Sequence, residues 1–323
     1  MRKTRFLSAV QLPLLLATNL PIASKEQTPT GHGISYRRQP STFVRGTDDM
    51  TTAWHDSIHQ CGRFLGGVAW GLLLCLGTPA LATGADSSVA ILAFHRFGPA
   101  VADSMTTRTA TFEAQLARLR QEGYSFKPLS KVVAGLEGRE ALPRKTVALT
   151  VDDGHRTVYS DLLPIIRREK LPVALFIYPS AISNAEYAMT WDQLREVMAT
   201  GLVEVHSHTY WHPNFRTEKR RLGPAEYEKL VRQQLERPRQ VLKSRLGVEA
   251  DQLAWPFGIH DAELEAAAKT AGYRAAFALG ERHVRADDSL LGLPRFLIVD
   301  ATGVNGLARL LSHGEGHNKG GQP

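Results

Sequence analysis

Two adjacent carboxylates, Asp152 and Asp153, stand at the end of an apolar run and are followed by Gly154. Neighbouring carboxylates repel each other, so we expect one of them to be neutralised by a metal ion, an arginine or a proton. Gly154 permits a sharp turn directly after a buried strand. Because Asp-Gly pairs are also common in ordinary turns, this motif alone leaves a purely structural role open.

Three histidines, His206, His208 and His212, lie within seven residues at the end of another apolar run. His208 and His212 are four positions apart, and on a helical turn both imidazoles would face the same way and share one cation. Two imidazoles and one carboxylate leave open coordination positions, as a catalytic zinc ion requires. His206 is left without an assigned role: it either supports the metal ligands or packs in the core.

A third apolar run ends in an aromatic turn over residues 255–258. Its rings either pack in the core or form the wall of a groove against which a sugar ring can stack. We expect Trp255 and Phe257 from this turn, and Tyr210 from the histidine segment, to contact a substrate.

The elements that must position these residues are short strands alternating with helices. Thr190 and Asp261 stand where helix N-caps belong, and Gly123, Gly201 and Gly272 where helices should end. The alternation predicts an α/β fold, a distorted (β/α) barrel of about seven parallel strands, with working residues at the carboxyl ends of the strands. The expected strands are 89–94, 146–151, 173–178, 202–206, 252–255, 274–279 and 295–299, and the expected helices are 111–122, 158–169, 191–200, 224–246, 261–271 and 304–311.

The net charge of +7 on 323 residues is unevenly distributed. Residues 1–82 hold 8 basic and 4 acidic side chains, so more than half of the net charge lies there. The remainder shows no basic stripe interleaved with aromatic residues, which excludes nucleic-acid binding. Both cysteines, Cys61 and Cys75, also precede residue 83, and a domain without free thiols suits an oxidising compartment.

An export segment is predicted over residues 50–82. Residues 64–82 carry no charge, follow Arg63 and end in Ala80-Leu81-Ala82, which is typical of a signal peptide, with an uncleaved membrane anchor as the alternative. We therefore expect a periplasmic or extracellular protein that contacts a membrane only through this segment. Met50 is the expected translation start, which would make residues 1–49 an over-extended gene start; residues 83–313 form the functional domain and 314–323 a flexible tail.

The order of the segments TVDDG, HSHTYWHP and AWPFG resembles the polysaccharide deacetylases of the NodB-homology type, carbohydrate esterase family 4. The resemblance covers about residues 89–300. Within this family the chain is most similar to the branch that deacetylates poly-β-1,6-N-acetylglucosamine. The similarity to that branch rests on Phe94-His95-Arg96, the following helix with Phe112, Gly123-Tyr124 and Leu293-Pro294-Arg295.

The resemblance implies a role for each polar residue. Asp153, His208 and His212 would bind a divalent metal, with zinc the expected ion, which polarises the acetamide carbonyl and acidifies a bound water. Asp152 would be the general base that takes the proton of that water. A general acid must then protonate the departing amine.

Two residues depart from the common pattern of the family. The usual arginine of the third motif is absent from the AWPFG segment, and Arg295 is expected to supply its charge from the last strand. The usual acid lies in a late Leu-x-His string, which Leu311-Ser312-His313 matches, but His313 follows a helical pattern rather than a strand. His95 ends the first strand and is the preferred acid.

The implied function is a metal-dependent hydrolase that removes N-acetyl groups from an N-acetylglucosamine-containing polysaccharide and releases acetate. The alternatives are a peptidoglycan or chitin-oligosaccharide deacetylase, and a non-catalytic carbohydrate-binding protein on the same scaffold. The intact carboxylate and histidine set argues against the last, because binding alone needs no base beside a metal. The expected partner is a carbohydrate polymer and the expected state a monomer.

Overall fold

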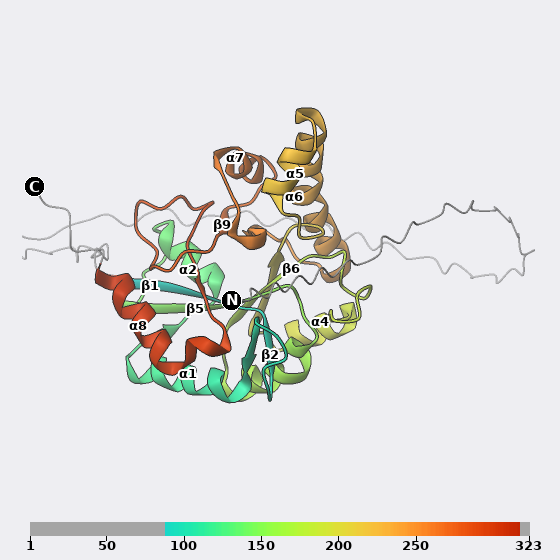
Figure 1. Ribbon diagram of the computed structural model, residues 1–323. Coiled ribbons are helices and arrows are strands. Elements are labelled where there is room, and N and C mark those ends of the chain that lie inside the picture. The colour runs from blue at the N-terminus through green and yellow to red at the C-terminus, as the bar shows by residue number, and fades with distance from the viewer. Residues whose placement is uncertain (1–87, 317–323) are drawn as a thin grey trace, which may run out of the picture. The chain divides into compact units, whose positions relative to one another are not determined.

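The computed structural model describes residues 88–316 (Figure 1), and the expectations for residues 1–49, the export segment and the last part of the tail lie outside this range. Seven short runs of mostly buried residues form parallel strands, and all seven match the expected ones. They are β1 (Ser88–Phe94), β5 (Lys145–Asp152), β6 (Val173–Ile177), β7 (Val203–Ser207), β8 (Gln252–Ala254), β9 (Ala275–Phe277) and β10 (Phe296–Leu297).

These strands confirm the predicted (β/α) barrel. Their order in the sheet is β10-β1-β5-β6-β7-β8-β9, so each strand from β5 to β9 lies beside its predecessor in the path. The residues just before β10 reach the other end of this path, since Leu293 forms a parallel bridge with Phe277 of β9. One short segment thus pairs with β9 at its start and with β1 at its end.

Helices cover the outside of the sheet (Figure 1). All six expected helices are present, although a π-helical turn, Val158–Leu162, replaces the first half of one of them. They are α1 (Thr109–Gln121), α3 (Leu163–Glu169), α4 (Trp191–Met198), α6 (Pro224–Leu246), α7 (Ala262–Thr270) and α8 (Gly303–Gly316). Since α8 continues to Gly316, the helix includes the first residues of the expected tail.

Five further strands and α-helices have no counterpart among the expected ones. Helix α2 (Leu129–Leu136) is only eight residues long and has no side-chain cap, so its start carries no sequence signal. Helix α5 (Phe215–Arg221) buries only Phe215 and therefore lacks an apolar stripe. The others are the short strands β2 (Arg96–Gly98), β3 (Thr106–Arg108) and β4 (Ser125–Phe126).

The predicted helix ends are confirmed. The Thr190 hydroxyl accepts a hydrogen bond from the backbone of Gln193, and Asp261 caps α7 in the same way through Leu264. Gly123, Gly201 and Gly272 all have positive φ just after a helix, a conformation that glycine adopts without strain.

None of the helices within residues 88–316 combines the length and the apolar composition that crossing a bilayer requires.

Candidate active site

The candidate residues share one edge of the barrel because alternate side chains of a strand point inward. In β1, Val89 and Ile91 belong to the buried cluster that also contains Phe176 and Phe277 from the opposite strands. The same period continues to His95, directly after β1. It likewise places Asp152, the last residue of β5, and His208, the first residue after β7, on the inward face at the carboxyl ends of their strands.

Asp152 forms a buried ion pair with Arg295. The two Arg295 Nη atoms lie 2.8 and 2.7 Å from the two carboxylate oxygens, and both residues are about 98% or more buried. Burial opposes ionisation of the carboxyl group, but the adjacent Arg295 charge prevails and holds the pKa of Asp152 well below its ordinary value. Arg295 also donates to Thr150 Oγ1 at 3.0 Å, which fixes the guanidinium plane. The expected contact between Arg295 and Asp152 is therefore present.

The neighbouring Asp153 faces two imidazoles instead of an arginine. Its Oδ1 atom lies 3.7 Å from His208 Nε2 and 3.9 Å from His212 Nε2. One ligand atom from each of these three residues lies within 4.8 Å of the others. Asp153 has φ 73° and Gly154 φ 72°, so the chain makes the predicted sharp turn here.

The chemistry of this donor set fits a divalent metal ion. His208 Nδ1 lies 2.8 Å from the carbonyl oxygen of Ala254, so the ring donates from Nδ1 and leaves Nε2 as a lone-pair ligand. Burial and the neighbouring His208 lower the pKa of His212 to about 4, which keeps its imidazole neutral at physiological pH. Neutral imidazoles and a carboxylate are the protonation states that a metal requires.

The expectation that His208 and His212 share a helical turn is wrong. Residues 208–214 form a loop in which Thr209 and His212 have positive φ values of 65° and 62°. The loop nevertheless brings the two imidazoles together, with ring centroids 4.6 Å apart. Thr209 Oγ1 accepts a hydrogen bond from the backbone of His212 at 3.2 Å, which closes this turn.

Gln234 of α6 holds the same loop from outside and was missed in the sequence. Its Oε1 atom accepts hydrogen bonds from the backbone of Tyr210 at 3.1 Å and of Trp211 at 3.0 Å. Gln234 is fully buried on the same side of α6 as Val231 and Leu235. A polar residue within the apolar stripe of an amphipathic helix was the available signal.

The structure places His95, but not His313, at the site. Burial lowers the pKa of His95, while Asp152 and Asp153 are close enough to oppose this shift. Its Nδ1 atom is buried and has no hydrogen-bond partner among the described residues. His313 is exposed on α8, ten residues after the start of this helix and hence about 15 Å along its axis.

The three aromatic residues expected to contact substrate have different environments. Trp255 is fully buried and its indole donates to the carbonyl of Leu291 at 2.8 Å, so it packs in the core and offers no face to a sugar. Phe257 is 58% exposed and its ring lies 4.7 Å from His212. Tyr210 is half-buried and lies under the guanidinium of Arg237, 4.0 Å away.

Two exposed aromatic residues beside the site were not anticipated. Trp211 is 41% exposed in the histidine loop. Tyr187 is 40% exposed, and its hydroxyl lies 2.5 Å from that of Tyr178, whose ring is 5.4 Å from His212. We refer to Phe257, Trp211 and Tyr187 together as the aromatic rim of the site.

Residues 139–276 match the polysaccharide deacetylase family. The chain is 26% identical over 245 residues to a poly-β-1,6-N-acetyl-D-glucosamine N-deacetylase of Escherichia coli strain K12, covering 65% of this chain and 36% of that protein. It is 25% identical over 194 residues to the enzyme of the same name from Staphylococcus aureus strain MRSA252, covering 58% of this chain and 66% of that protein. The chain thus spans about a third of the first relative and about two thirds of the second.

Solved structures share the fold. IcaB from Ammonifex degensii has 26% sequence identity and a TM-score of 0.60, with 69% of this chain and 97% of that chain covered. The deacetylase PplD of Streptococcus pyogenes, solved with acetate, has 20% identity and a TM-score of 0.62, with coverage of 70% and 99%.

Proposed function

We propose that the chain, whose residues 139–276 match the polysaccharide deacetylase family, is a metal-dependent N-deacetylase of an N-acetylglucosamine polysaccharide that releases acetate. The observation that carries the proposal is that two adjacent aspartates have different partners: Asp153 faces two imidazoles, and Asp152 faces Arg295. The names of the curated relatives favour poly-β-1,6-N-acetylglucosamine as the polymer.

The metal site in this proposal consists of Asp153, His208 and His212, and zinc is the ion that a carboxylate and two imidazoles suit best. When bound, such an ion polarises the acetamide carbonyl and acidifies water. The contact from Ala254 holds the His208 ring so that Nε2 faces the site.

Asp152 accepts the proton of the attacking water, and Arg295 positions its carboxylate for this transfer. Because Arg295 contacts both oxygens, the carboxylate cannot rotate away from the water. The lowered pKa of Asp152 means that it holds the proton only weakly and passes it on readily. This suits a group that must be ionised again before the next turnover.

His95 is the proposed proton donor to the departing amine. Its lowered pKa makes the imidazole neutral in the resting enzyme, so it acts as an acid only after it has received a proton during the reaction. Asp152 is the neighbouring group that supplies this proton. The buried Nδ1 atom without a partner is free for such an exchange within the described part of the chain.

Substrate contacts are proposed for the rim rather than for the buried indole. Phe257 and Tyr210 stay candidates, and Trp211 and Tyr187 join them because exposed aromatic faces are suited to stacking on sugar rings. The location outside the cytoplasm and the monomeric state stay predictions, supported by the export-like segment and by the polymeric nature of the substrate.

The test is acetate release from N-acetylglucosamine oligomers, measured with and without a chelator. We expect turnover that is lost on chelation, restored by zinc and absent from the Asp153→Asn variant. The matched control, Asp287→Asn, changes an exposed aspartate outside the site and should retain wild-type turnover. Acetate release that persists in the chelated enzyme would overturn the proposal.

A further inference from the structure

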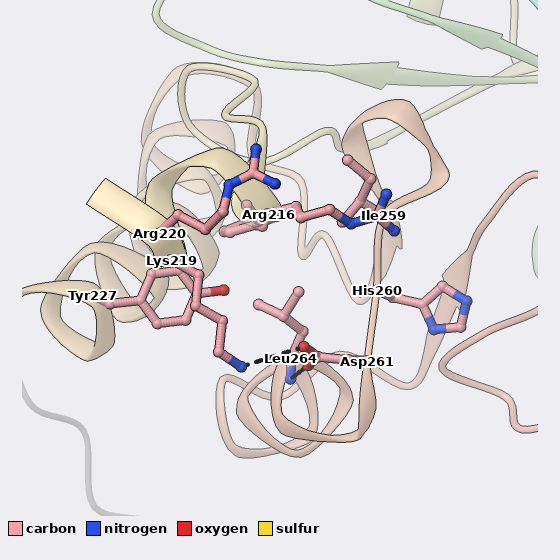
Figure 2. A pocket seen from close by; sticks show the side chains of 9 residues that line it. Arg216, Lys219, Arg220, Tyr227, Ile259, His260, Asp261 and Leu264 are labelled. Carbon is pink, nitrogen blue, oxygen red and sulfur yellow. Dashed lines mark hydrogen bonds and ion pairs between the residues drawn. The ribbon is translucent and has the colours of Figure 1, made fainter. Parts of the chain in front are cut away.

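A pocket lies between α5, α6 and α7, beside the proposed active site (Figure 2). Its volume is about 250 Å³. Two loops connect it with the site: residues 208–214 lead from the metal ligands into Phe215 of α5, and the aromatic turn leads from Phe257 to Ile259 and His260. A single glycan chain can therefore contact both this pocket and the aromatic rim of the site.

The pocket has an excess of positive charge. Arg216, Lys219 and Arg220 line it from one face of α5, at the three- and four-residue spacing that brings side chains together on a helix. Lys219 is neutralised by Glu263 at 2.6 Å and Asp261 at 3.5 Å. Arg216 and Arg220 form no ion pair or hydrogen bond with any described residue, so two cationic groups remain uncompensated.

Tyr227 adds a hydrogen-bond donor to the same pocket. Its side chain is 4% exposed, and its hydroxyl is directed into the space between α5 and α7, where it has no hydrogen-bond partner among residues 88–316 (Figure 2). Burial raises the pKa of Tyr227 to about 12, so the hydroxyl keeps its proton. The hydroxyl oxygen itself is accessible from the pocket, so it can donate a hydrogen bond to a ligand acceptor there.

The remaining walls suit a sugar better than a small inorganic ion. Phe215, Ile259 and Leu264 supply apolar surface, and the cavity of about 250 Å³ has roughly eight times the volume of one liquid water molecule. In Figure 2, Arg216 extends across the pocket toward Ile259, so its guanidinium lies near the turn that leads to Phe257.

We propose that this pocket binds an anionic substituent, a carboxylate or phosphate, carried by the glycan at a residue other than the one being deacetylated. The proposal rests on the deacetylase function proposed above and adds that the N-acetylglucosamine polysaccharide carries acidic substituents. Arg216 and Arg220 bind the oxyanion, Tyr227 donates a hydrogen bond to it, and the apolar wall contacts the sugar ring.

The test is a titration of the intact protein with N-acetylmuramic acid, N-acetylglucosamine and inorganic phosphate, followed through the backbone amide NMR signals of Ile259 and His260. N-acetylmuramic acid differs from N-acetylglucosamine by a lactyl group with one carboxylate. We expect it to shift these signals to saturation, with N-acetylglucosamine and phosphate binding at least about tenfold more weakly. Arg216→Ala/Arg220→Ala should weaken N-acetylmuramic acid binding about tenfold or more, and Tyr227→Phe about fivefold.

The control is Arg118→Ala/Arg167→Ala, which removes two positive charges from α1 and α3. Equal weakening by both double variants would show general charge attraction and overturn the proposal, as would equal binding of the two sugars or no shift at all. Binding of phosphate alone would show a site for free anions and overturn the assignment to the glycan. Failure of the deacetylase function is distinguishable, because it would appear as absent acetate release by the metal-loaded wild-type enzyme whatever the pocket binds.

Discussion

Two inward-facing histidines, one in β7 and one directly after it, have opposite environments. His208, at the edge of the barrel, has its Nδ1 atom anchored to Ala254 and its Nε2 atom 3.7 Å from Asp153. His206 lies two residues deeper, and neither of its buried ring nitrogens has a hydrogen-bond partner among the described residues. Its nearest charged neighbour is Glu204, with Oε2 3.6 Å from Nε2.

The difference shows what makes a histidine a ligand in this barrel. Both residues have the same inward orientation and nearly the same burial, so neither property distinguishes them. What His208 has in addition is a fixed tautomer and a second imidazole, that of His212, close to its free nitrogen. His206 instead packs against Phe176, with ring centroids 5.7 Å apart, and lines a second cavity with Glu204 and Gln252.

The largest expected loss of activity follows from replacing His208, at the edge of the barrel. His208→Ala removes one of three metal ligands, so we expect metal binding to fail and acetate release to fall at least about a thousandfold, because such a metal contributes several kcal/mol to the reaction. Metal content and turnover are the measurements. A His208→Ala enzyme that kept its metal and its rate would remove the distinction between the two histidines.

The next largest loss of activity is expected from breaking the ion pair between Asp152 and Arg295, beside the metal ligands. Arg295→Met leaves the buried Asp152 without its cation, so we expect kcat/KM to fall about a hundredfold through misplacement of the carboxylate. Arg295 lowers the pKa of Asp152, and its loss raises that pKa. The acidic limb of the pH–rate profile should therefore move to higher pH.

The same substitution has a consequence for stability. In the wild type, the lowered pKa of Asp152 contributes stability that is present above the unfolded carboxyl pKa of about 3.9 and lost as the pH falls toward the folded value. Denaturant unfolding of Arg295→Met at several pH values should lack this contribution. An unshifted acidic limb together with wild-type stability would contradict the positioning role of Arg295.

A smaller effect is expected behind the histidine loop. Gln234→Leu leaves the backbone N–H groups of Tyr210 and Trp211 without their acceptor, so the loop that carries His212 should become less well positioned. We expect about a tenfold loss of zinc affinity, within the range seen for residues that orient metal ligands. Competition with a coloured zinc chelator measures this change, and Gln233→Leu on the exposed side of α6 is the matched control.

The smallest effect is expected deeper in the barrel. His206→Leu replaces a buried imidazole that makes no hydrogen bond with the described residues by an apolar side chain, so we expect stability to change by no more than about 1 kcal/mol. In this variant Glu204 still accepts a hydrogen bond from the backbone N–H of Ser130, at 3.1 Å. Unfolding in urea and zinc content are the measurements. Loss of zinc from this variant would show that His206 supports the metal ligands after all.

The barrel could be predicted because its signals are local. Each strand is a short apolar run, and the caps at Thr190 and Asp261 mark helix starts by residue type alone. In a parallel (β/α) barrel, polar working residues collect at the carboxyl ends of the strands. This rule predicts that Asp152, Asp153, His208 and His95 lie at one edge of the barrel. These steps require no knowledge of contacts between distant segments.

What could not be predicted depends on such contacts. The burial of Trp255 is set by packing against Phe215 and by its bond to Leu291, 36 residues away in sequence. The support of the histidine loop comes from Gln234, more than 20 residues beyond it. The loop conformation was mistaken for a helical turn because a four-residue spacing fits both, and only the positive φ values of Thr209 and His212 separate them.

The central claim, that the edge of the barrel holds a metal on which deacetylation depends, is tested most directly by zinc reconstitution. Chelator-stripped protein would be titrated with zinc while acetate release from N-acetylglucosamine oligomers is measured. The account predicts that turnover rises from baseline and saturates at one zinc ion per chain. Full turnover by the stripped protein, independent of added metal, would contradict it.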